Sequence, residues 1–84
     1  MKLYPVTSMR KPEFDPAAIE PHSAFLQRLR EEGRLQLAGP FIDKSGGAYL
    51  IRAGDHAEAR KLADQDPVHT TCSSLVTVYE WDAK

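Results

Sequence analysis

The alternation of apolar and polar positions along the chain predicts four strands. They lie over Leu3–Met9, Leu35–Phe41, Ala48–Ala53 and Ser74–Trp81. The segment Asp43–Gly47 between the second and third is rich in glycine and polar residues, which is typical of a turn. The second and third strands are therefore predicted to form a hairpin.

A first helix is predicted between the first and second strands. Asp15 followed by Pro16 is typical of an N-cap and a first helical position. Pro21 leaves two interpretations open, a helix that begins near Glu20 or a short first turn followed by a kink. Gly33 is a typical residue to end the helix. One helical face carries the residues at i, i+3, i+4 and i+7: His22, Phe25, Leu26 and Leu29.

A second helix is predicted between the third and fourth strands. Asp55 is its expected N-cap, and Glu58 three residues later completes a pattern like a capping box. Pro67 is expected to end this helix, with a loop over Val68–Ser73. Its apolar face carries the residues at i, i+3, i+4 and i+7: Ala59, Leu62, Ala63 and Asp66. Asp66 is therefore predicted to lie in the last turn.

The order β-α-β-β-α-β predicts a single ferredoxin-like α+β domain over residues 1–84. Right-handed crossovers give a four-stranded antiparallel sheet with two helices on one face. A chain of 84 residues buries only about 60% of its unfolded surface, so its own core is marginal. The open sheet face is expected to be covered by a second copy, which makes a homodimeric α+β barrel.

Composition and charge exclude several classes of protein. Apolar residues make up 42% of the chain and charged residues 27%, which are ordinary globular values. The net charge is −1 with no basic stripe, so nucleic acid is not an expected partner. The apolar runs fall short of the roughly 20 residues that span a membrane, and the amino terminus lacks an apolar leader. The single Cys72 cannot form an internal disulfide. These features predict a bacterial-type cytoplasmic domain.

The two helices each carry one ionisable residue in register with the apolar stripe. His22 is near the start of the first helix and Asp66 at the end of the second, and antiparallel helices bring these ends together. An aspartate in a last turn opposes the helix dipole, at a cost of about 0.3–1 kcal/mol. A carboxylate beside an imidazole fixes its tautomer, which suits general acid or base catalysis. The pair could equally tie the two helices together, or His22 could be a surface residue.

Other residues are weaker candidates for a site. Gly39 and Pro40 end the second strand, either as a simple bend or because a ligand approaches the backbone closely there. Arg10 could bind an acidic substrate, although an arginine at a strand end is usually solvated. His69 and Cys72 have the spacing H-x-x-C, but two ligands do not make a metal site. No metal and no cofactor are therefore expected.

The sequence resembles the YciI-like (YCII-related) family of small bacterial proteins over roughly Ile19 to Pro67. No one motif is specific, but the ordered set of His, Gly-Pro and Asp-Pro is. The residues that carry the resemblance are His22-Ser-Ala-Phe25-Leu26, Leu29, Gly33, Ala38-Gly39-Pro40-Phe41, Gly46-Gly47 and Ala59 through Asp66-Pro67.

The resemblance implies a ferredoxin-like fold, a dimeric α+β barrel and a site built on His22 and Asp66. Gly39, Pro40 and Phe41 are then expected to line this site. Most members of the family have no assigned reaction, although a related protein is a dehydrochlorinase and similar barrels include isomerases. The leading hypothesis is a lyase- or isomerase-type acid–base enzyme acting on a small polar or aromatic molecule. A non-catalytic ligand-binding or accessory module and a purely structural domain stay open as alternatives.

Overall fold

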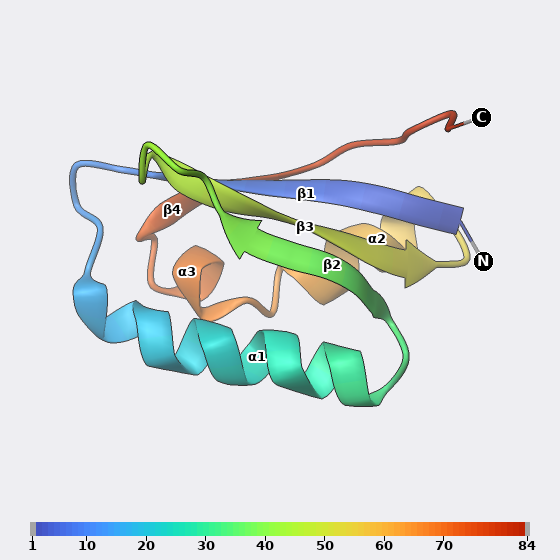
Figure 1. Ribbon diagram of the computed structural model, residues 1–84, viewed down its shortest axis with the longest axis horizontal. Helices are drawn as coiled ribbons and strands as arrows, with labels where there is room; N and C mark the ends of the chain where they lie inside the picture. Colours follow the sequence, from blue (N-terminus) through green and yellow to red (C-terminus); the bar gives the residue numbers. More distant parts are fainter. Residues whose placement is uncertain (1, 84) are drawn as a thin grey trace.

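Four strands form one antiparallel sheet in the computed structural model, which describes residues 2–83 (Figure 1). They are β1 (Lys2–Arg10), β2 (Leu35–Pro40), β3 (Gly46–Ala53) and β4 (Ser74–Val78). Their order in the sheet is β2-β3-β1-β4, as the ferredoxin-like topology requires. The predicted fold class is therefore confirmed.

Pro5 lies within the central strand β1 without leaving a gap in the hydrogen bonding. Its carbonyl accepts a hydrogen bond from the backbone N–H of Tyr79, one residue beyond the end of β4. In an antiparallel ladder the N and O of one residue face the same neighbour. The missing N–H of Pro5 therefore faces Tyr79, beyond the end of β4, and removes no bond to the residues of β4 itself.

The helices all cover one face of the sheet (Figure 1). The short 3-10 helix η1 (Pro16–Ala18) leads directly into α1 (Ile19–Glu31). Pro21 thus lies in the first turn of α1, where its missing N–H has no role in the helix. Asp15 caps η1 by accepting from the backbone N–H of Ala17 at 2.9 Å, and Gly33 follows α1 with φ +75°, both as predicted.

The second helical segment differs from the prediction. Helix α2 (His56–Ala63) ends three residues earlier than expected, and Asp66 begins a separate short helix, α3 (Pro67–Thr70). The expected loop over Val68–Ser73 and the placement of Asp66 in a last turn are therefore wrong. The physical reason is the Asp-Pro step, because a residue before proline is pushed out of the helical region. Asp66 has φ −64° and ψ 128°, an extended conformation.

The core lies between the sheet and the helices. It takes the inward residues of β1, β3 and β4 together with Phe25 and Leu29 of α1. Burial of apolar side chains stabilises such an interface by about 25 cal/mol per Å² removed from water. None of the helices within residues 2–83 is long and apolar enough to cross a membrane.

The β2–β3 hairpin turns earlier than the sequence indicates. Gly46 and Gly47 were expected in the turn, but both belong to β3. Asp43 and Lys44 make the turn instead, with Lys44 at φ 63°. The Asp43 carboxylate accepts from the Ser45 backbone and hydroxyl at 2.9 and 2.6 Å, and these bonds lower the pKa of Asp43. Gly46 serves close packing, because a Cβ there would lie 2.1 Å from the carbonyl oxygen of Ser8.

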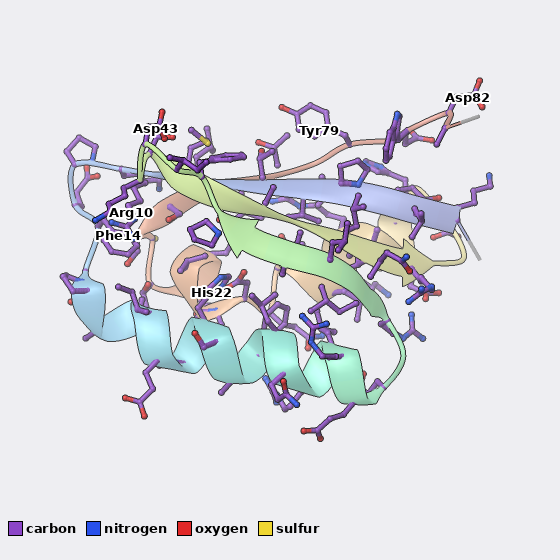
Figure 2. The ribbon with its side chains drawn as sticks, viewed as in Figure 1. Arg10, Phe14, His22, Asp43, Tyr79 and Asp82 are labelled. Atoms are coloured by element: carbon purple, nitrogen blue, oxygen red, sulfur yellow. The ribbon has the colours of Figure 1, made fainter. Side chains whose placement is uncertain are left out.

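The face of the sheet away from the helices is apolar and open. One row of paired positions crosses β2, β3 and β1 and ends just beyond β4: Leu37 opposite Leu50, Leu50 opposite Pro5, and Pro5 bonded to Tyr79. Leu37 is 63% exposed and Tyr79 51%. Figure 2 shows Tyr79 on the side of the sheet opposite the helices. A second pair on this face joins Met9 of β1 to Leu75 of β4, which is 60% exposed.

Candidate functional site

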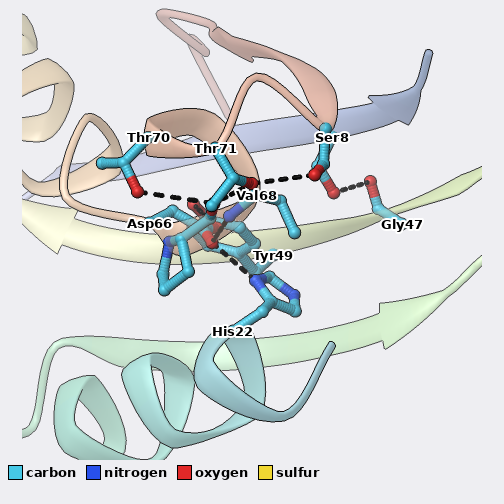
Figure 3. A network of polar contacts seen from close by, with 10 residues as sticks. Ser8, His22, Gly47, Tyr49, Asp66, Val68, Thr70 and Thr71 are labelled. Carbon is cyan, nitrogen blue, oxygen red and sulfur yellow. Dashed lines mark hydrogen bonds and ion pairs between the residues drawn. The ribbon is translucent and has the colours of Figure 1, made fainter. Parts of the chain in front are cut away.

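His22 and Asp66 meet at one end of the helical layer (Figure 3). Nδ1 of His22 lies 2.7 Å from Oδ1 of Asp66, in the range of a strong charge-assisted hydrogen bond. His22 projects from the second turn of α1, while Asp66 stands at the junction of α2 and α3. Because an ionised carboxylate only accepts, Nδ1 carries the hydrogen, and Nε2 is the nitrogen left for another molecule.

Asp66 is fully buried, and its two oxygens accept three hydrogen bonds. Oδ1 accepts from the backbone N–H of Val68 at 3.0 Å as well as from His22. Oδ2 accepts from the hydroxyl of Tyr49 at 2.9 Å. The first of these bonds is an N-cap of α3, so the carboxylate lies at the favourable end of that helix. A buried carboxylate requires such compensation, because an unpaired one is very costly.

Tyr49 is a member of this site that the sequence interpretation missed. It lies on the inward face of β3 and is 3% exposed. Burial, followed by the negative charge of Asp66, raises the pKa of the Tyr49 phenol well above its ordinary value. Its hydroxyl thus stays a hydrogen-bond donor. The signal in the sequence was a tyrosine at an inward position of a strand, since a buried Tyr hydroxyl needs a polar partner.

A pocket of about 400 Å³ opens beside His22, within the usual range for small-molecule sites. One wall is a single face of α1 and the opposite wall is the end of β2. The residues that line it are Ser8, Arg10, Phe14, Ile19, His22, Ser23, Leu26, Gln27, Arg30, Ala38, Gly39, Pro40, Gly46, Gly47, Ala48, Tyr49, Val68 and Ser74. It combines apolar surface with hydroxyl, amide and guanidinium groups, so it suits a small molecule that is partly apolar and partly polar.

The other predicted site residues divide between the pocket and its surroundings. Arg10, Gly39 and Pro40 line the pocket, but Phe41 is not among its lining residues. Phe41 instead begins the hairpin turn, where its N–H donates to the carbonyl of Gly46 at 2.8 Å. Phe41 thus lies outside the pocket lining, and its place in the site stays a prediction. A Cβ at Gly39 would meet no atom within 4 Å, so the space at this position is open.

No group of three His, Cys, Asp or Glu side chains within residues 2–83 is arranged to hold a metal ion. His69, one member of the H-x-x-C spacing, has its Nε2 3.5 Å from the carboxylate of Asp64.

Comparison with known proteins gives both a family and a fold. The model of the YCII-related domain matches residues 4–82. The uncharacterised protein YjpA of Bacillus subtilis is 39% identical over 84 residues, which is 100% of this chain and 99% of that protein.

Two solved structures are similar in fold at low sequence identity. One is 5-chloro-2-hydroxyhydroquinone dehydrochlorinase from Burkholderia phenoliruptrix, in complex with 2,5-dihydroxybenzoquinone. Its TM-score is 0.78 at 19% identity, covering 99% of this chain and 96% of that one. The other is a muconolactone isomerase, with a TM-score of 0.77 at 16% identity, covering 99% of this chain and 91% of that one.

Proposed function

The chain belongs to the YCII-related domain family, and on that premise we propose that it is a small-molecule enzyme using His22 as a general acid and base. The observation that carries this proposal is the 2.7 Å contact between Nδ1 of His22 and Oδ1 of Asp66 at the wall of a pocket. Asp66 is proposed as the residue that orients the imidazole. The substrate is proposed to be a small polar or aromatic molecule.

The chemistry follows from the state of the imidazole. With the Nδ1 hydrogen donated to Asp66, the neutral ring offers its Nε2 lone pair as a base. Nε2 takes a proton from a carbon of the substrate, and the electron pair of the broken C–H bond stays on the substrate as an enolate or carbanion. The same proton is then returned at another carbon, which is an isomerisation, or an adjacent leaving group departs with its electron pair, which is an elimination. The buried Asp66 carboxylate stabilises the imidazolium formed in between.

The fold neighbours support this class of reaction without identifying a substrate. One neighbour is a dehydrochlorinase, holding a dihydroxybenzoquinone, and the other is an isomerase. The pocket of about 400 Å³ is of a size to accept one ring. Phe14, Ile19 and Leu26 supply apolar surface for such a ring, and Gly39 and Pro40 leave the backbone of β2 accessible beside it.

A second candidate function is a non-catalytic ligand-binding module in which the His22–Asp66 pair is structural. The favouring observation is that Asp66 already has two partners independent of His22, the N–H of Val68 and the hydroxyl of Tyr49. A carboxylate that caps α3 and satisfies a buried phenol has a reason to be there without any reaction. In that case His22 would add a third bond and no chemistry.

Proton exchange into carbon positions tests the two candidates without knowledge of the substrate. A panel of lactones, enones, unsaturated carboxylates and hydroquinones is incubated with the protein in D₂O, and deuterium incorporation is followed by NMR and mass spectrometry. We expect His22→Gln to slow exchange about 100-fold or more, since the base is lost. His69→Gln is the matched control, because His69 lies outside the pocket. Equal exchange in wild type and His22→Gln would contradict the acid–base role. Ligand binding with no exchange across the panel would favour the binding module.

We also propose that the protein is a homodimer joined through the open sheet face. The row that runs from Leu37 through Leu50 and Pro5 to Tyr79 presents apolar side chains on three strands and just beyond the end of the fourth. A contiguous apolar surface of this kind marks an interaction site in a soluble protein. The pairing of two such faces buries both surfaces in one sheet-on-sheet contact.

A further inference from the structure

The pocket beside His22 is cationic, although the chain as a whole is not. Its lining residues include two arginines, Arg10 and Arg30, and the titratable side chains His22 and Tyr49, but no aspartate or glutamate. Asp66, the carboxylate behind His22, is 0% exposed. A molecule in the pocket therefore meets positive groups and hydrogen-bond donors, while the net charge of −1 resides elsewhere.

The two pocket arginines have no ion-pair partner within residues 2–83, whereas two of the arginines outside the pocket do. Arg34 pairs with Glu58 at 2.5 Å and Arg60 with Asp64 at 2.9 Å. The Arg10 guanidinium stacks instead on Phe14, with its central carbon 4.3 Å from the ring centroid. Stacking uses the flat face of a guanidinium and leaves its in-plane N–H donors for a planar anion. Figure 2 shows Arg10 and Phe14 together near the start of α1.

The pocket is a groove that follows one face of α1. The lining residues of this helix recur at intervals of three and four positions: Ile19, His22, Ser23, Leu26, Gln27 and Arg30. From Ile19 to Arg30 the helix advances about 16 Å. Arg10, which is stacked on Phe14, lies beside the start of α1. Arg30 lies in the last turn of the same helix. His22 thus lies along the groove between two cationic positions.

We propose that this groove binds small aromatic or unsaturated carboxylates, with the carboxylate on Arg10 and the apolar body between Phe14, Leu26 and His22. This inference rests on the proposed function, because it names the substrate class of the same site. Arg10 presents a pair of donors that match the two oxygens of a carboxylate. Arg30 supplies a second positive charge at the far end of the groove, which attracts longer or doubly charged acids. A cation beside the substrate also favours the enolate that forms when His22 removes a proton.

Binding of three single-ring probes of similar size tests the charge preference. Benzoate, benzamide and benzylamine are titrated into the full chain at constant ionic strength, and Kd is measured from amide chemical shifts. We expect benzoate to bind at least about tenfold more tightly than neutral benzamide, and cationic benzylamine most weakly. Equal binding of benzoate and benzamide would overturn the proposal.

Variants then test the residues. Arg10→Gln should weaken benzoate binding about tenfold and leave benzamide unchanged, and Arg10→Lys should recover part of the loss. Arg28→Gln is the control, because Arg28 is an exposed arginine of α1 that lies outside the groove. Undiminished benzoate binding in Arg10→Gln would overturn the assignment. In His22→Gln we expect proton exchange with the substrate panel to be lost, while benzoate binding weakens less than in Arg10→Gln. Loss of exchange thus tests the acid–base role, and the charge preference of binding tests the arginine site.

Discussion

Tyr49 and Asp66 illustrate how single residues determine which groups surround His22. The buried phenol donates to Oδ2 of Asp66, and this bond leaves Oδ1 to the N–H of Val68 and to His22. The orientation of the imidazole thus depends on a tyrosine that lies behind it. Without the Tyr49 donor, the N–H of Val68 would be the remaining donor to Asp66 besides His22, and the carboxylate would orient the imidazole less firmly.

Tyr49→Phe is expected to lower the free energy of unfolding by about 1–3 kcal/mol, because it leaves a buried carboxylate oxygen without its donor. Urea unfolding followed by circular dichroism measures this loss. Tyr79→Phe is the matched control, since Tyr79 is half-exposed, and it should change stability by less than about 0.5 kcal/mol. Equal effects of the two substitutions would show that the bond to Asp66 contributes nothing.

The raised pKa of Tyr49 predicts how the free energy of unfolding changes with pH in alkaline solution. Burial and the charge of Asp66 raise the pKa of Tyr49 in the folded state, while the unfolded chain releases this proton near the ordinary pKa of about 10. The protonated phenol of Tyr49 therefore makes its full contribution to the free energy of unfolding below about pH 10, and this contribution is lost as the pH rises above that value. Wild type should lose stability more steeply than Tyr49→Phe between pH 10 and 11, as measured by urea unfolding at each pH. Parallel curves would contradict this linkage.

At the scale of elements, the Asp-Pro step appears twice and acts in the same way both times. Asp15 caps η1 by accepting from the N–H of Ala17, and Asp66 caps α3 by accepting from the N–H of Val68. The sequence interpretation recognised the first as the start of a helix and took the second for the end of one. The apolar spacing of α2 extended to Asp66 and concealed the break after Ala63, yet the predicted proximity to His22 did not depend on that detail.

The two capping aspartates of the second half of the chain should differ strongly in importance. Asp66→Ala is expected to lower the free energy of unfolding by about 3–5 kcal/mol, because the donors of His22, Tyr49 and Val68 all lose their buried acceptor. Asp55→Ala removes only an exposed cap, which accepts from the N–H of Glu58 at 2.8 Å, and should cost about 1 kcal/mol. Chemical denaturation of both variants provides the comparison. Similar losses would mean that Asp66 is no more than a helix cap.

At the scale of the whole molecule, the helices cover one face of the sheet and leave an apolar surface on the other. The β2 strand contributes to this surface through an irregularity at Gln36. Leu35 pairs with Ile51 and Leu37 with Leu50, so one extra residue separates them and reverses the facing of Leu37. Without this bulge, Leu37 would share the inward face with Leu35, and the outer row would be interrupted.

The proposed dimer predicts that a charge on the open face produces monomers. Leu75→Arg replaces a 60% exposed side chain beside Met9 and should separate the copies, because an unpaired charge within a sheet-on-sheet contact is costly. Sedimentation equilibrium measures the mass against 9.4 kDa for one chain. Ile42→Arg, in the fully exposed hairpin turn, is the control and should leave the mass unchanged. A monomeric wild type at micromolar concentration would contradict the dimer.

The sequence by itself determined the order of the four strands and the two longer helices, the ferredoxin-like topology, the caps at Asp15 and Asp55, and the inward face of α1. These features depend on local rules of periodicity, capping and backbone restriction, which act over a few residues. The approach of His22 to Asp66 also followed from the topology, because connected elements of this order allow few arrangements.

Only the tertiary structure decided which residues surround that pair. Tyr49 lies 17 positions before Asp66, and Arg10 and Arg30 reach one groove from a strand and a helix far apart in sequence. The bulge at Gln36 and the close approach of Gly46 to Ser8 depend likewise on how strands pair. Such contacts are set by packing between distant segments, and no local pattern encodes them.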